Sequence, residues 1–175
     1  MTDTNNAMNQ FDSRAINTPV YESLNKLRTA YNKAKKNGQV SEKDYERRLG
    51  EQKSQAQELY TYLATWGLMR LRAEEMSRNA WENLEEVTLA TRAKENQEGK
   101  REMLECFFQC LERVAKLKSG AIADANGMDT LNEMDSETYL GLTGIALAVA
   151  REFSFWADAI YADLKEGQLA AKKED

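Results

Sequence analysis

The apolar residues between Tyr45 and Val87 recur at steps of three and four, and this period constrains the fold more than any other feature of the chain. An α-helix has about 3.6 residues per turn, so the period places these side chains on one helix face. The chain has one proline and nine glycines in 175 residues, so few positions favour turns. We therefore expect an all-α protein, a helical bundle of about five helices with a long second helix from residue 42 to about residue 92. A break in that helix would fall at Gly67 or Ser77.

Shorter apolar stripes and helix-end signals predict the remaining helices. Thr18 can cap the first of them, and Pro19 suits its first turn, where the missing N–H would lack a partner anyway. Asn37 and Gly38 provide the stop. Ser136 can cap the last helix. We expect these helices at residues 19–36, 100–118 and 137–165, with an acidic connection at residues 119–135.

The length of the chain suits one domain. We expect a single helical bundle domain at residues 17–165, between a polar, flexible N-terminus (1–16) and a flexible tail (166–175). The N-terminus lacks the basic and apolar regions of a signal peptide, which predicts a cytoplasmic protein. The longest apolar stretch, residues 139–150, has 12 residues. A membrane span needs roughly 20, so we expect no membrane contact.

Several kinds of catalytic and metal site are disfavoured by the residues available. The chain has no histidine, the commonest general base and metal ligand. Cys106 and Cys110 lie one helical turn apart, which predicts free thiols, and alone they cannot complete a zinc site. A calcium loop starting at Asp124 would need glycine and glutamate where Asp129 and Asp135 stand. No phosphate-binding glycine motif occurs. We expect no enzyme, no cofactor and no metal.

The net charge of -5 is unevenly distributed along the chain. Residues 1–120 hold 20 of the 24 Lys and Arg against 18 acids, whereas residues 121–175 hold 4 basic and 11 acidic residues. One interpretation is that these charges are simply solvated helix faces. The other is a basic side for a polyanion and an acidic side for a protein partner.

Residues 139–160 resemble the C-terminal helix of the small subunit of type III-B CRISPR effector complexes, the Cmr small-subunit family. A weaker match covers residues 59–71, where Trp66-Gly67-Leu68 is similar to the Asn-Gly-Leu of the family. The proline usual before Gly-Leu is absent, and residues 152–155 replace a stretch that contains a Lys-Arg pair. The positions in register in the last helix are Tyr139, Leu140, Leu142, Thr143, Ala146, Leu147, Ala157 and Ala159.

The resemblance implies a non-catalytic structural subunit of an RNA-guided, RNA-targeting ribonucleoprotein of antiviral defence. Its partners would be other subunits of the complex, copies of itself, and the backbone of the crRNA and target RNA. Since only the chain before residue 121 is net basic, the expected RNA-binding residues lie on the second helix: Arg47, Arg48, Lys53, Arg70, Arg72 and Arg78. Two alternatives remain: a helical protein-protein adaptor without nucleic-acid contact, and an enzyme that acts through carboxylates.

Overall fold

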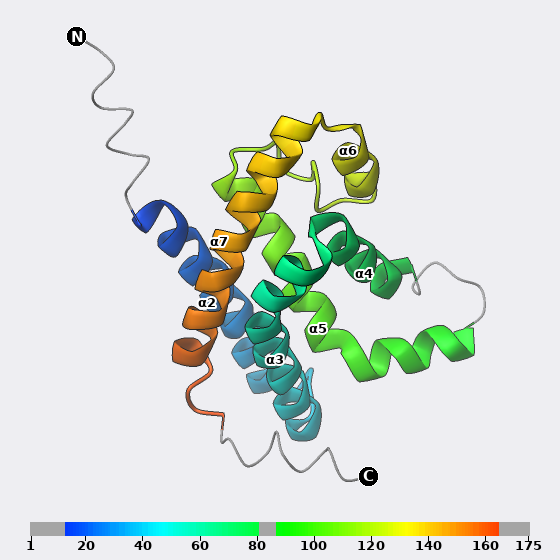
Figure 1. The fold of residues 1–175 in the computed structure, drawn as a ribbon. Helices are drawn as coiled ribbons and strands as arrows, with labels where there is room; N and C mark the ends of the chain where they lie inside the picture. The colour runs from blue at the N-terminus through cyan, green and yellow to red at the C-terminus, as the bar shows by residue number, and fades with distance from the viewer. Residues whose placement is uncertain (1–12, 81–86, 165–175) are drawn as a thin grey trace.

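The computed structural model describes residues 13–80 and 87–164, and it describes the side chains of these residues except at 78–96 (Figure 1). This part of the chain contains six helices and no strand, so the predicted all-α class is confirmed. The helices are α2 (Arg14–Lys36), α3 (Glu42–Trp66), α4 (Leu68–Ala80), α5 (Val87–Val114), α6 (Gly127–Glu133) and α7 (Ser136–Ile160).

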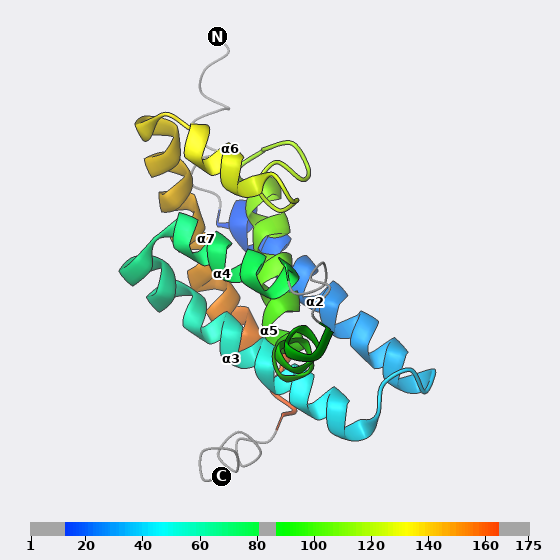
Figure 2. The same cartoon turned by 90° about the vertical axis from the view of Figure 1, so that its right-hand side faces the viewer.

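Helices α2, α3, α5 and α7 pack against one another around a shared apolar core, and α4 packs on α5 and α6. The aromatic rings of Phe107 and Phe153 meet edge to face in this core, with centroids 5.6 Å apart. The α6 helix and the start of α7 lie at one end of the bundle, and the turn between α2 and α3 lies at the other (Figures 1 and 2).

The expected second helix is interrupted at Gly67, so the prediction of one continuous helix to residue 92 was wrong. Gly67 has φ +82° and ψ 170°, a conformation that only glycine adopts readily. This residue ends α3, and α4 starts directly after it with a separate set of contacts to α5 and α6. The break falls at one of the two positions that the sequence indicated.

The ends of the other helices also differ from the prediction. The α2 helix begins at Arg14, so Thr18 does not cap it and Pro19 lies inside it. At the start of α7, the cap is Asp135, which accepts a hydrogen bond from the Thr138 N–H at 2.9 Å, rather than Ser136. A carboxylate one residue earlier can reach the same unpaired backbone donors. The helix stops at Ile160 rather than at residue 165.

Two further differences concern the middle of the chain. The predicted helix 100–118 is the second half of α5, which is kinked at Gln97 (φ -143°) and ends at Val114. The kink lies between the predicted end of one helix near residue 92 and the predicted start of the next at residue 100. The predicted connection at 119–135 contains the short helix α6.

The structure does not describe residues 1–12 and 165–175, so most of the two predicted flexible ends lies outside the described residues. Residues 14–16, which we assigned to the flexible N-terminus, belong to α2. The single domain expected at residues 17–165 stays a prediction.

Candidate nucleic-acid interface

Lysines gather around the turn between α2 and α3. Lys33, Lys35 and Lys36 occupy the last turn of α2, where the free carbonyls of a helix favour positive charge. Lys43 lies in the first turn of α3. The ammonium of Lys35 is 2.7 Å from the Glu42 carboxylate, and the hydrogen bond to Glu42 raises the pKa of Lys35. This lysine is therefore paired within the turn.

The three other lysines, Lys33, Lys36 and Lys43, are exposed. Within the described part of the chain none of them has an ion pair or a side-chain hydrogen bond. Nearby, Asp44 is engaged by the Ser41 hydroxyl at 2.7 Å, and this hydrogen bond lowers the pKa of the Asp44 carboxyl. We call Lys33, Lys36 and Lys43 the basic turn. Long, flexible ammonium side chains of this kind bind phosphates as point charges and do not read sequence.

Arg47 and Arg48, both predicted to bind RNA, join α3 to α5 instead. Arg47 is 2.8 Å from the Glu51 carboxylate and 3.6 Å from that of Glu98. Arg48 forms an ion pair with Glu98 and donates to the Tyr31 hydroxyl at 3.1 Å. Their side chains are 16% and 24% exposed. Their charges are thus largely compensated within the bundle.

Lys53 and Arg72, also predicted to bind RNA, are buried. The ammonium of Lys53 lies 3.8 Å from the Asp158 carboxylate, and its side chain is 11% exposed. Arg72 donates to the backbone carbonyls of Asp124 at 2.5 Å and Ala123 at 3.3 Å, forms an ion pair with Glu75, and is 2% exposed. Burial lowers the pKa of Arg72. In this fold Arg72 holds the loop before α6 and is out of reach of a polyanion.

The two remaining predicted residues lie on α4. Arg70 is exposed, and its guanidinium stacks 4.3 Å from the ring centre of Trp66, a side chain that is 53% exposed. Such a cation–π pair leaves the edges of the guanidinium free to donate. Arg78 lies in α4, but its side chain is outside the described residues. Among the predicted RNA-binding residues whose side chains the structure describes, only Arg70 is exposed.

The sequence contained a signal for the basic turn, because Lys33, Lys35 and Lys36 stand directly before Asn37-Gly38. Lysines at this position also stabilise the C-terminus of a helix, through its free carbonyls. That role and exposure to a ligand are compatible, since a lysine near helix carbonyls still projects its ammonium into solvent. What the sequence could not show is which cations have partners on other helices.

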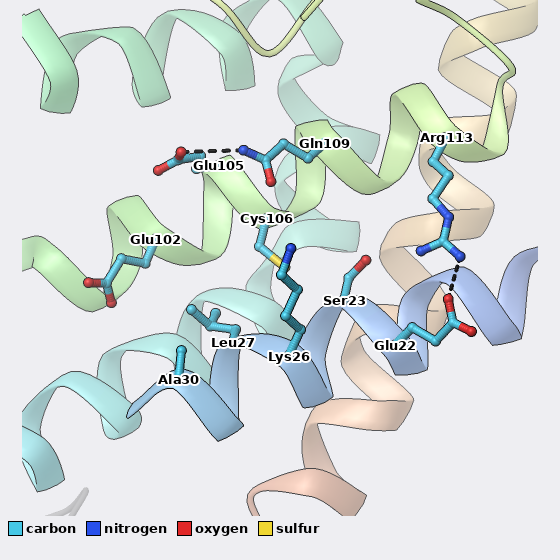
Figure 3. A pocket seen from close by; sticks show the side chains of 10 residues that line it. All are labelled: Glu22, Ser23, Lys26, Leu27, Ala30, Glu102, Glu105, Cys106, Gln109 and Arg113. Carbon is cyan, nitrogen blue, oxygen red and sulfur yellow. Dashed lines mark hydrogen bonds and ion pairs between the residues drawn. The ribbon is translucent and has the colours of Figure 1, made fainter. Parts of the chain in front are cut away.

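A groove of about 520 Å³ lies between α2 and α5 (Figure 3). At one end is Glu102, whose carboxylate accepts from the Tyr31 hydroxyl at 2.5 and 2.6 Å and from the Gln52 amide at 2.9 Å. Burial raises the pKa of Glu102. The Tyr161 hydroxyl donates to Gln52 at 2.7 Å. The groove is lined by Glu22, Ser23, Lys26, Leu27, Ala30, Glu102, Glu105, Cys106, Gln109 and Arg113.

The two cysteines lie on α5, with Cys106 in the groove wall, and both are free thiols. Burial raises the pKa of both, to about 11 for Cys110. The thiols are therefore protonated near neutral pH and are weak nucleophiles. In the part of the chain that the structure describes, no three His, Cys, Asp or Glu side chains are grouped to hold a metal ion.

Comparison with known proteins adds no relative to this picture. No protein-family model, no curated protein and no solved structure matches the chain.

Proposed function

We propose that this chain is a non-catalytic structural subunit of a type III-B CRISPR effector ribonucleoprotein, which contacts the backbone of the crRNA and target RNA through the basic turn. The observation that carries the RNA contact is the exposure of Lys33, Lys36 and Lys43, none of which has an ion partner among the described residues. Contacts of this type neutralise phosphates and are indifferent to sequence. They suit a protein that supports an RNA duplex whose sequence is read by base pairing.

The assignment to the Cmr small-subunit family rests on the resemblance in residues 139–160 and 59–71. The two segments touch in the fold, because the Tyr139 hydroxyl accepts the backbone N–H of Met69 at 3.2 Å. That N–H belongs to the first turn of α4, where a helix lacks an internal acceptor. Leu142, Ala146 and Ala157 of the matched positions are core residues of α7. The resemblance thus covers positions that pack together in this fold.

The proposal moves the RNA contact from the arginines of α3 to the lysines of the basic turn. Arg47, Arg48, Lys53 and Arg72 hold helices and a loop in place. Arg70 is retained as a second, peripheral contact, because it is exposed beside Trp66.

The test is purification of the tagged full-length chain from its native host after ultraviolet crosslinking. The proposal expects co-purifying effector subunits, a crRNA, and RNA crosslinked to peptides that contain residues 33–43. Recovery of protein partners without RNA would contradict it. That result would support the adaptor hypothesis.

The alternative function, a helical protein-protein adaptor without nucleic-acid contact, is favoured by one observation. Leu140 and Phe155 on the solvent side of α7 are 68% and 63% exposed, although both are large apolar side chains. Exposed apolar residues along one helix face are typical of a surface that binds another protein.

A further inference from the structure

The α7 helix packs against α2, α3 and α5, and it also carries large apolar residues on the side that these helices leave exposed. Its inner side supplies Leu142, Ala146, Val149 and Phe153 to the core. Yet α7 is long and apolar enough, by length and composition only, for a membrane span, and only 33% of its most apolar 18-residue stretch is buried. A helix that is hydrophobic all round is normally covered on all sides. The solvent side of α7 therefore lacks a cover in the isolated chain.

The uncovered side of α7 forms a defined stripe. Successive residues on a helix are rotated by about 100°, so residues at steps of three and four from Gly144 point the same way. Of these, Leu140 and Phe155 are exposed, and Leu147 and Ala148 are half-buried. We call the following residues the outer stripe: Leu140, Gly141, Gly144, Leu147, Ala148 and Phe155.

The middle of the outer stripe carries no side chain at two positions, because two of its residues are glycines. A Cβ atom added at Gly141 or Gly144 would meet nothing within 4 Å. The backbone of α7 is therefore open to close approach from outside. Small residues at a helix crossing allow two backbones to come nearer than larger side chains permit.

Two charged residues lie at equal distances along the helix on either side of Gly144. Glu137 lies seven residues before Gly144 and Arg151 lies seven residues after it. Seven residues make about two helical turns, so both side chains share the direction of Gly144. Both are exposed, and within the described part of the chain neither has an oppositely charged partner. Arg151 rests on Tyr60, with its guanidinium 5.1 Å from the ring centre.

We propose that the outer stripe binds a second copy of this chain, with the two α7 helices antiparallel and crossing at Gly144. In that arrangement Glu137 of each copy lies opposite Arg151 of the other. Leu140 then faces Ala148, and Leu147 faces Gly141, so each large side chain meets a small one. The contact is two-fold symmetric, which makes it self-complementary and closed.

The symmetric charges favour a second copy over the other occupants of such a surface. A lipid bilayer would leave Glu137 and Arg151 without partners at both ends of the apolar stripe, which is costly. An unrelated protein gives no reason for opposite charges at equal distances from a glycine. A second copy gives such a reason, since in one register Glu137 of each copy pairs with Arg151 of the other. The inference does not depend on RNA contact, and it assigns a surface and a register to a contact between copies of the chain, which the resemblance implies only in general.

A charge swap tests the register. In the full chain, Glu137→Arg and Arg151→Glu each place like charges at both ends of the crossing, and the double variant restores both pairs. By sedimentation equilibrium we expect a dimer for the native chain, with each single variant dissociating at least about tenfold more readily, a change of roughly 1.4 kcal/mol. The double variant should recover native dimerisation. Glu133→Arg, an exposed control on α6 with the same charge change, should dimerise like the native chain.

A crosslink tests the crossing point independently of affinity. Gly144→Cys places two thiols at the two-fold axis, and a disulfide needs Cα atoms roughly 4–7 Å apart. We expect a covalent dimer on mild oxidation, formed much faster than with the exposed control Asn132→Cys. A chain that stays monomeric at high concentration, together with equal crosslinking of the two variants, would overturn the proposal. Flotation of that monomer with phosphatidylcholine vesicles would then assign the stripe to lipid, and absence of flotation would assign it to another protein.

Discussion

At the end of the bundle that carries α6, Arg72 is enclosed by backbone carbonyls and a carboxylate, and Glu112 accepts backbone N–H groups from Gly120, Ile122 and Ala123 at 2.7 to 2.9 Å. At the opposite end, where α2 turns into α3, Lys33 and Lys36 are exposed to solvent. Charged side chains thus bind backbone groups of the fold at the first end, whereas at the second end Lys33 and Lys36 are exposed on the surface.

The difference follows from what each end has to satisfy. The segment between α5 and α6 runs without a helix, so its buried N–H and C=O groups need side-chain partners. A guanidinium and a carboxylate supply several donors or acceptors each. The turn between α2 and α3 is short, and its backbone groups bond within the turn, as Gly38 N–H does to Lys35 O. The turn therefore does not need its lysine side chains as hydrogen-bond partners. Because several cations elsewhere in the chain are buried or paired, a count of cations overstates the charge available to a ligand.

The largest effect is expected at Glu112. Its carboxylate is 3% exposed and is the acceptor for three backbone N–H groups. Glu112→Ala should lower the free energy of unfolding by about 3–5 kcal/mol, since it leaves three backbone N–H donors without their acceptor and removes a negative charge near Arg72. Urea denaturation measures the change, with the exposed Glu133→Ala as a control expected within about 0.5 kcal/mol of the native chain. A loss below about 1 kcal/mol for Glu112→Ala would remove the contrast between the two ends.

A smaller effect is expected at the junction of α3 and α4. Gly67→Ala should cost about 1–3 kcal/mol, because an L-residue is strained at φ +82° and ψ 170° even though the space around it is open. Gly141→Ala, at a helical position with equally open space, should instead stabilise the chain by about 0.5–1 kcal/mol. Thermal unfolding of both at low concentration measures the difference in sign. Equal effects would mean that α3 and α4 can form one continuous helix.

Nearer the basic turn, the buried carboxyl of Glu102 should make stability depend on pH. Burial raises the pKa of Glu102 in the folded state above its ordinary value, so the folded chain holds this proton to higher pH than the unfolded chain. The native chain should therefore lose stability relative to Glu102→Gln as the pH rises from the ordinary glutamate pKa through the raised one. Urea denaturation of both chains from about pH 4 to pH 8 tests this, since the ordinary glutamate pKa is about 4.3. Parallel stability curves would show that Glu102 is not perturbed.

The sequence predicted the helices well because the apolar period is a local property. Gly67 was one of the two positions at which the sequence allowed a break in the second helix. Because the apolar stripe continues in phase from α3 into α4, the period alone could not show whether the helix breaks there. Helix ends were less accurate, since Asp135 and Ser136 are both good caps and only geometry selects one.

For the predicted RNA-binding residues, the sequence could not show which of them have partners on other elements of the fold. Arg48, Lys53 and Arg72 have partners 50 or more residues away in the sequence, namely Glu98, Asp158 and the carbonyl of Asp124. No pattern within one helix reveals such a partner. The acids that pair with α3 become neighbours only when α5 and α7 pack against it.

The salt dependence of RNA binding tests the central claim, that the lysines of the basic turn are the cations available to RNA. In effector particles assembled with Lys33→Glu/Lys36→Glu, the logarithm of affinity for unrelated RNAs should depend less steeply on the logarithm of salt concentration, by roughly two units. Chain stability should fall by no more than about 2 kcal/mol, because two carboxylates replace two ammonium groups at the C-terminal end of α2. Lys116→Glu/Lys118→Glu, an exposed pair with the same charge change, should keep the native slope. An unchanged slope for the Lys33 and Lys36 variant in intact particles would contradict the account.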